Sequence, residues 1–154
     1  MDELGFSAWI WNGNAIRADM SVRCGITLQT QGLGNRVVFN LPPAEGDALA
    51  VYRPATARQI MVALAECWKP HWATLTSDTL RRVQLPPPRS PVVGWMTYLA
   101  AERSIDRALL PPGVTAEELA SGTLITIGNE GTAVTSDLVL AVREALGDAL
   151  LPGT

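Results

Sequence analysis

Histidine and cysteine are scarce in this chain of 154 residues, which contains one histidine, His71, and two cysteines, Cys24 and Cys67. A metal centre usually needs several histidine, cysteine or carboxylate ligands at close spacing, and the sequence shows no such spacing. The two cysteines lie far apart and form neither a C-x-x-C motif nor a disulfide framework. We therefore expect no metal, no cofactor and no disulfide-stabilised scaffold.

An excess of basic residues is also missing, since 12 Lys and Arg stand against 15 Asp and Glu, for a net charge of −3. Nucleic-acid binding needs clustered basic residues to neutralise phosphates, so direct binding of nucleic acid is not expected. A mildly acidic chain is compatible with a basic protein partner.

Long apolar runs are absent too. No run approaches the roughly 20 residues that span a bilayer, and the first residues lack the basic start and apolar stretch of a signal peptide. We therefore expect a cytoplasmic protein that does not contact a membrane. The length and the 47% of hydrophobic residues predict one domain, residues 1–154, with a substantial core.

The clearest pattern is strict alternation from Ile16 to Leu28, in which every even position is apolar; this is typical of a half-buried strand. Asn12-Gly13 before it favours a two-residue hairpin turn, which places Trp9 and Trp11 on the apolar face. A longer loop places Phe6, Ala8 and Ile10 there instead.

Further elements follow along the chain. Arg36–Leu41 predicts a third strand and hence an antiparallel meander. Thr56 and Gln59 form a capping box for a helix that ends at Lys69-Pro70, with Ile60, Leu64, Cys67 and Trp68 as its apolar stripe. Trp72–Thr76 is expected to return to the same sheet, and the proline-rich segment 81–91 is expected to be a stiff exposed loop.

The C-terminal half predicts two more strands, Val92–Leu99 and Thr123–Ile127, and a short helical turn capped by Thr115 and Glu118. A last helix runs from Ser136 to Leu150, capped by Ser136 or Asp137. The predicted fold class is α+β, a mainly antiparallel sheet packed by two principal helices.

Candidate catalytic groups are weak. His71 is interpreted as a helix-end residue bonded to a carbonyl, and both cysteines as small core residues. Nucleophile-elbow and Walker motifs are absent, and the carboxylates are scattered. Core positions are expected for Trp68, Trp72 and Trp95, but five tryptophans leave room for a partly exposed one on a protein-binding surface. A binding protein is therefore favoured over an enzyme.

The run Pro91-Val-Val-Gly-Trp-Met-Thr-Tyr-Leu99 resembles the signature strand of the immunity protein 52 family, antidotes to bacterial polymorphic toxins. Other segments occur in the family's order: Trp11–Gly13, Cys24-Gly25, Asn40–Pro42, Trp68–Trp72, Leu109–Pro112 and Gly122–Ile125. The first strand begins within six residues of Met1, whereas family members are expected to carry more sequence before it.

The resemblance implies a cytoplasmic inhibitor without catalytic activity. Its partner is expected to be a toxin with a restriction-endonuclease-fold nuclease domain, delivered by type VI secretion or a related contact-dependent system. A nuclease surface is usually basic where it attracts phosphate, so an acidic partner gains association rate. Loops carry most binding residues, and the hypothesis for toxin binding names five loop positions: Glu45, Asp47, Arg89, Asn129 and Glu130.

Two alternatives remain open from the sequence. One is a small-ligand-binding or enzymatic domain with a pocket formed by His71, Tyr98 and a carboxylate. The other is a non-catalytic adaptor for an unrelated protein.

Overall fold

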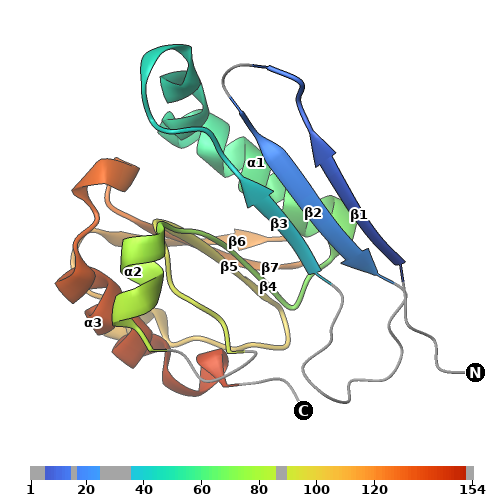
Figure 1. The fold of residues 1–154 in the computed structure, drawn as a ribbon. Helices are drawn as coiled ribbons and strands as arrows, with labels where there is room; N and C mark the ends of the chain where they lie inside the picture. Colours follow the sequence, from blue (N-terminus) through green and yellow to red (C-terminus); the bar gives the residue numbers. More distant parts are fainter. Residues whose placement is uncertain (1–5, 15–16, 25–35, 86–89, 152–154) are drawn as a thin grey trace, which may run out of the picture. The chain divides into compact units, whose positions relative to one another are not determined.

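A computed structural model of the chain describes residues 6–14, 17–24, 36–85 and 90–151. The chain divides into two compact units, residues 1–49 and 50–154. Antiparallel strands and several helices make up the fold, which confirms the α+β class (Figure 1). A 3₁₀ helix, η2 (Gly46–Tyr52), crosses the boundary between the units.

The first unit contains the predicted meander. Its three antiparallel strands lie in the order β1-β2-β3. Their bounds are Phe6–Trp11 for β1, Asp19–Cys24 for β2 and Arg36–Asn40 for β3. Ile16 and residues 25–28 of the predicted long strand lie outside the described residues.

The β1–β2 connection differs from the predicted two-residue turn. Trp11 pairs with Asp19 and Ile10 with Met20, so the connection comprises residues 12–18. Its base is held by Asn12, whose backbone N–H donates to the Ala18 carbonyl (3.0 Å) and whose Oδ1 accepts from the Ala18 N–H (3.2 Å). The two-residue turn is therefore wrong, and the longer-loop alternative is confirmed.

This register decides which side chains share each face of the sheet. Opposite residues of antiparallel strands point to the same side. One side, the apolar face, comprises Phe6, Ala8, Ile10, Met20, Val22, Cys24, Val37 and Phe39. The other, the tryptophan–arginine face, comprises Ser7, Trp9, Trp11, Asp19, Ser21, Arg23, Arg36, Val38 and Asn40.

The second unit has its own four-stranded antiparallel sheet, in the order β4-β5-β7-β6. The strand bounds are Trp72–Leu75 for β4, Met96–Ala100 for β5, Val114–Leu119 for β6 and Gly122–Ile127 for β7. The expectation that Trp72–Thr76 returns to the first sheet is wrong, because this segment pairs with β5.

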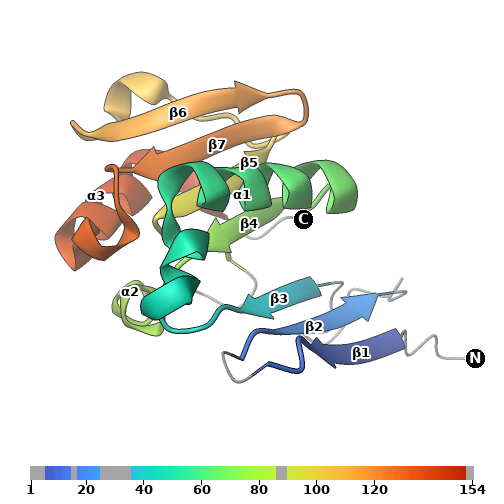
Figure 2. The same ribbon diagram turned by 90° about the horizontal axis from the view of Figure 1, so that it is seen from above.

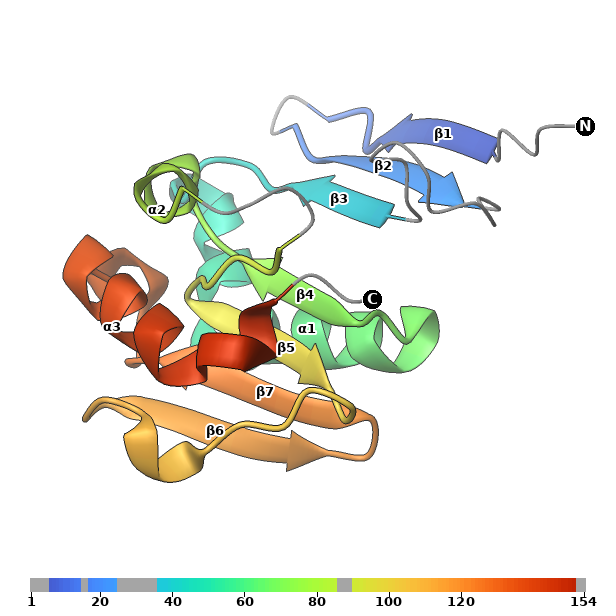
Figure 3. The same ribbon diagram turned by 90° about the horizontal axis from the view of Figure 1, so that it is seen from below.

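Helices cover both faces of this sheet. The α helices are α1 (Pro54–Trp68), α2 (Asp78–Val83) and α3 (Ser136–Leu146). The remaining short 3₁₀ helices are η3 (Arg107–Leu109), η4 (Gly131–Ala133) and η5 (Gly147–Leu150). Figure 2 shows α1 across one face, and Figure 3 shows α3 and η5 across the other.

The core accordingly has two layers. Met96, Tyr98 and Leu124 pack with Ala57, Met61 and Ala65 of α1. On the opposite face Leu99, Ile125 and Ile127 pack with Val139, Val142 and Leu146 of α3. Every residue of β5 is buried, because a central strand covered on both sides has no solvent face. No helix among the described residues is both long and apolar enough to cross a membrane.

Helix α1 differs from its predicted form. It begins at Pro54, and its N-cap residue Arg53 makes no side-chain cap, so the predicted capping box is wrong. The buried stripe is Ala57, Met61 and Ala65, whereas Cys67 and Trp68 are exposed. Small alanines let the helix approach the sheet closely, and this favours their stripe over the bulkier predicted one.

Three further predictions are corrected. The segment around Thr115 is the strand β6, because it pairs along its whole length with β7. Residues 78–83 form α2, capped by the Ser77 Oγ, which accepts from the Leu80 N–H (3.2 Å), so no exposed loop begins at residue 81. Helix α3 is capped by Thr135, and the predicted last helix continues beyond Leu146 as the 3₁₀ helix η5.

Candidate protein-binding site

Glu45 and Asp47 lie in the tight turn that leads into η2. The Glu45 N–H donates to the Pro43 carbonyl (2.8 Å), and the Glu45 carbonyl accepts from the Ala48 N–H (3.1 Å). Ala48 is buried, whereas both acidic side chains are exposed and belong to none of the ion pairs among the described residues. Both carboxylates therefore lie at the surface with no ionic partner among the described residues.

Asn129 and Glu130 lie in the turn after β7, and both are exposed. The Gly128 N–H donates to the Gly113 carbonyl (2.9 Å), and the Glu130 carbonyl accepts from the Ala133 N–H (3.1 Å). Backbone hydrogen bonds on both sides of the two residues limit the freedom of the turn, which is the preorganisation that a binding loop benefits from.

Gly131 fixes the same turn to the core. A Cβ at this position would lie 2.7 Å from Cε3 and 2.9 Å from Cδ2 of Trp95. The indole is 3% exposed, and its Nε1 has no hydrogen-bond partner within the described part of the chain. The glycine backbone therefore packs directly against the buried ring, and this contact fixes the position of the Asn129–Glu130 turn relative to the core.

Arg89, the fifth predicted binding residue, lies outside the described residues. The residues that flank its segment are firmly held. Gln84 Nε2 donates to the carbonyls of Leu80 (2.8 Å) and Val93 (2.7 Å), and its Oε1 accepts from the Val93 N–H (2.9 Å). The Pro91 carbonyl accepts from Arg143 Nη1 (3.1 Å).

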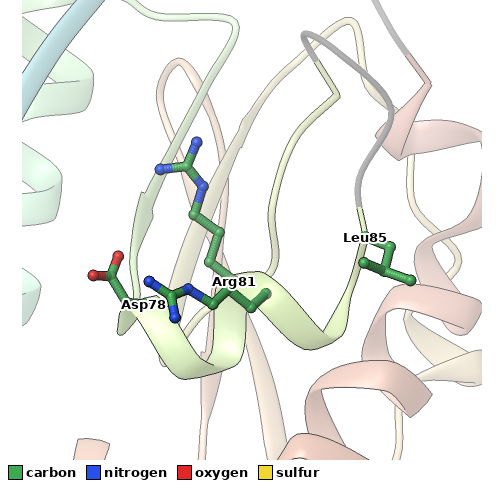
Figure 4. A pocket seen from close by; sticks show the side chains of 4 residues that line it. Asp78, Arg81 and Leu85 are labelled. Carbon is green, nitrogen blue, oxygen red and sulfur yellow. The ribbon is translucent and has the colours of Figure 1, made fainter.

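A shallow depression lies on α2 and is lined by Asp78, Arg81, Arg82 and Leu85. Figure 4 shows Asp78 and Leu85 at opposite ends of the helical segment, pointing away from each other. All four described lining side chains come from one short stretch of chain. Among the described residues, no polar group from a second element converges on the depression, so this lining does not resemble a ligand site.

The sequence predicted a hydrogen bond from the His71 side chain to a carbonyl, but the side chain instead contacts a carboxylate. Its Nδ1 lies 2.7 Å from Glu102 Oε1, and this hydrogen bond lowers the pKa of Glu102. Tyr98 is buried and donates its hydroxyl to the Ser121 carbonyl (2.7 Å). The structure therefore brings His71 to a carboxylate but does not bring Tyr98 into a shared pocket with them.

The carboxylates, cysteines and histidine that the structure describes do not gather into a metal centre. Within the described ranges, no group of three or more His, Cys, Asp or Glu side chains could hold a metal ion.

Trp9 and Trp11 were not among the binding residues expected from the sequence. They are 55% and 46% exposed and lie on the same face of the edge strand β1. Trp68, expected in the core, is also 47% exposed. The sequence of β2 held a signal for this arrangement. Its apolar residues are even-numbered and pair with the even-numbered residues of β1. The odd-numbered tryptophans of β1 therefore lie on the opposite side of the sheet.

The Gly94–Leu99 segment is a structural element of the second unit. Thr97 Oγ1 accepts from the Gly94 N–H (3.0 Å), and a Cβ on Gly94 would lie 2.2 Å from the Leu75 carbonyl oxygen. Trp95, Tyr98 and Leu99 are all buried. These residues position the central strand and contact solvent very little, so they form the core of the unit and not an exposed surface.

Comparison with known proteins identifies one family. The model of immunity protein 52 matches residues 1–151, nearly the whole chain. No protein with a curated description matches. Immunity proteins bind a cognate toxin protein, which suggests a role in binding and not in catalysis. The chain therefore belongs to the immunity protein 52 family, as its motifs predicted.

Proposed function

We propose that this protein binds a cognate bacterial toxin and neutralises it in the cytoplasm, and that the toxin is a nuclease of restriction-endonuclease fold. Delivery of that toxin by type VI secretion or a related contact-dependent system belongs to the same proposal. The observation that carries it is the family match over residues 1–151.

The toxin contacts are proposed to include the two exposed turns. Glu45, Asp47 and Glu130 carry exposed carboxylates, and Asn129 adds an exposed amide that can both donate and accept hydrogen bonds. A nuclease attracts DNA with basic side chains, and carboxylates on an inhibitor match that charge and accelerate association. Arg89 belongs to the same proposed set.

The test begins with the toxin encoded beside the gene for this chain. The two proteins are co-purified, and plasmid degradation by the toxin is measured with and without the chain. We expect a stable complex and loss of DNA cleavage. Absence of a complex, or a complex that cleaves DNA at the full rate, would contradict the proposal.

A charge-reversal variant tests the turns separately. Glu45→Lys, Asp47→Lys and Glu130→Lys are combined, and we expect at least about a tenfold loss of affinity with a weaker dependence on salt. Glu66→Lys with Glu144→Lys is the control, since both residues are exposed in the last turns of helices, where a cation is favourable. If the triple variant binds the toxin with unchanged affinity, the two turns are not part of the toxin contacts, but the proposal that the chain binds a toxin still stands.

A further inference from the structure

We infer that the tryptophan–arginine face of the β1-β2-β3 sheet is a docking surface for an acidic patch on the cognate toxin. The inference rests on the proposed toxin binding but does not require the toxin to be a nuclease. It assigns a surface on the side of the sheet opposite the apolar face.

The apolar part of this surface is exposed. Trp9 and Val38 both lie opposite Ser21, so the register forms a row across the three strands. Trp9, Trp11 and Val38 are 55%, 46% and 42% exposed. Clustered exposed apolar side chains mark interaction sites, and tryptophan and arginine are among the residues most enriched at interface hot spots.

Trp9 is held in place before any partner arrives. The guanidinium of Arg17 lies 5.3 Å from the centre of the Trp9 ring, within the range of a cation–π interaction. Arg17 Nε also lies 3.3 Å from Asp19 Oδ2, and Asn40 Nδ2 donates to Asp19 Oδ1 (2.6 Å). This chain of contacts orders the tryptophan, so binding loses little side-chain entropy.

The charge of the face indicates an acidic partner. Arg23 lies directly opposite Arg36 on the neighbouring strand, and like charges at opposite positions destabilise a sheet. Neither arginine belongs to an ion pair within the part of the chain that the structure describes. Asp19, the acidic residue of the face, is already engaged by Arg17 and Asn40. A carboxylate from a partner would relieve the repulsion between the two arginines.

A protein fits this surface better than a nucleic acid does. Aromatic rings on a sheet can stack with bases, but Arg17 already lies over the Trp9 ring, where a base would have to stack.

The decisive variant is Arg23→Glu, measured in complex formation with the toxin encoded beside the gene. This change places a carboxylate opposite Arg36, a favourable pair, so resistance to urea should stay equal or rise. Toxin affinity should nevertheless fall by at least about tenfold, more at low salt than at high salt. A merely structural role for Arg23 cannot produce weaker binding together with equal or greater stability.

Trp9→Ala provides the second measurement, with an expected loss of affinity of about 30-fold. Trp68→Ala and Arg53→Glu are the matched controls, because both residues are exposed in the second unit, and each should bind within about twofold of wild type. Circular dichroism confirms that each variant is folded.

Each contrary result is distinct. If the wild type binds the toxin and Arg23→Glu and Trp9→Ala bind it equally well, the docking face is overturned but the proposed function is not. Failure of the wild type to bind the toxin overturns both. The inference is also overturned if the wild type binds a single-stranded oligonucleotide or a second copy of the chain, and these variants lose that binding while their toxin affinity is unchanged. The face would then bind another occupant.

Discussion

Gly131 is the residue at which a surface turn and the buried core meet. Its backbone contacts the Trp95 ring, and a Cβ there would lie 2.7 Å from Cε3. Real Cβ contacts are essentially never this short, so either the ring or the turn must move. The turn carries Asn129 and Glu130, two of the proposed binding residues.

Gly131→Ala is therefore expected to lower the free energy of unfolding by about 1–3 kcal/mol, the usual cost of overpacking a core. Urea denaturation measures this change, and the indole N–H resonance of Trp95 should shift. Gly128→Ala is the control, because Gly128 has a φ of +64° but open space around its Cβ position. It should cost about 1–2 kcal/mol through backbone strain alone, with the Trp95 resonance unmoved. An unshifted resonance in Gly131→Ala would contradict the contact.

At the scale of elements, one ion pair joins α1 to the edge strand β6. Arg58 Nε donates to Glu117 Oε2 (2.8 Å), and Nη2 donates to the other carboxylate oxygen. The hydrogen bonds from Arg58 lower the pKa of Glu117 below its ordinary value of 4.5. Both side chains are nearly half exposed, so solvent screening keeps the contribution small.

The pH dependence of this pair follows from the direction of the shift. A carboxylate whose folded pKa is lowered stabilises the fold above its unfolded pKa, and the contribution is lost as the pH falls through the folded pKa. Arg58→Gln should therefore destabilise the protein slightly at pH 7, and the difference from wild type should shrink below the ordinary pKa of 4.5.

Urea midpoints of wild type and Arg58→Gln, measured at about pH 7 and about pH 3, test this expectation. Arg82→Gln is the control, because Arg82 is exposed and belongs to none of the ion pairs among the described residues. A difference for Arg58→Gln that persists equally at the acidic pH would show that Arg58 acts through packing.

At the scale of the whole molecule, the two units differ in how much core each builds. The first has three strands and leaves Phe6, Ile10 and Phe39 at least 44% exposed. The second covers a four-stranded sheet on both faces. A three-stranded sheet of this size is marginal when isolated, so its stability should depend on the rest of the chain.

We therefore expect residues 1–154 to unfold in one cooperative transition, as the single-domain prediction requires. Amide resonances of β2 and β5, followed in one urea titration, should disappear at the same midpoint. Two separate midpoints would show that the units fold independently and that the chain has two domains.

Much of the local structure could be predicted from the sequence. Alternating apolar residues placed β2, the Lys69-Pro70 pair ended α1, and the Thr123–Ile127 strand was placed to within one residue of β7. The exposure of Glu45, Asp47, Asn129 and Glu130 also followed from the local turn chemistry. Such features depend on neighbouring residues, whose conformational preferences act within a few positions of the chain.

Other features depended on contacts between distant segments. Thr115–Glu118 has the pattern of a helix cap, yet pairing with β7 makes it a strand, because a ladder of tertiary hydrogen bonds exceeds a weak local preference. The identity of the buried stripe of α1 was likewise set by the fit of alanines against the sheet.

The sequence by itself determined the fold class, the main strands and the family, since periodicity and ordered motifs are properties of the chain alone. Only the tertiary structure decided that the strands form two sheets, that Gly131 lies on Trp95, and that Trp9 and Trp11 share an exposed face with arginines. A one-residue change in strand register moves every side chain to the other face, and the register of β1 was set by a seven-residue connection (12–18) that the Asn-Gly pair did not reveal.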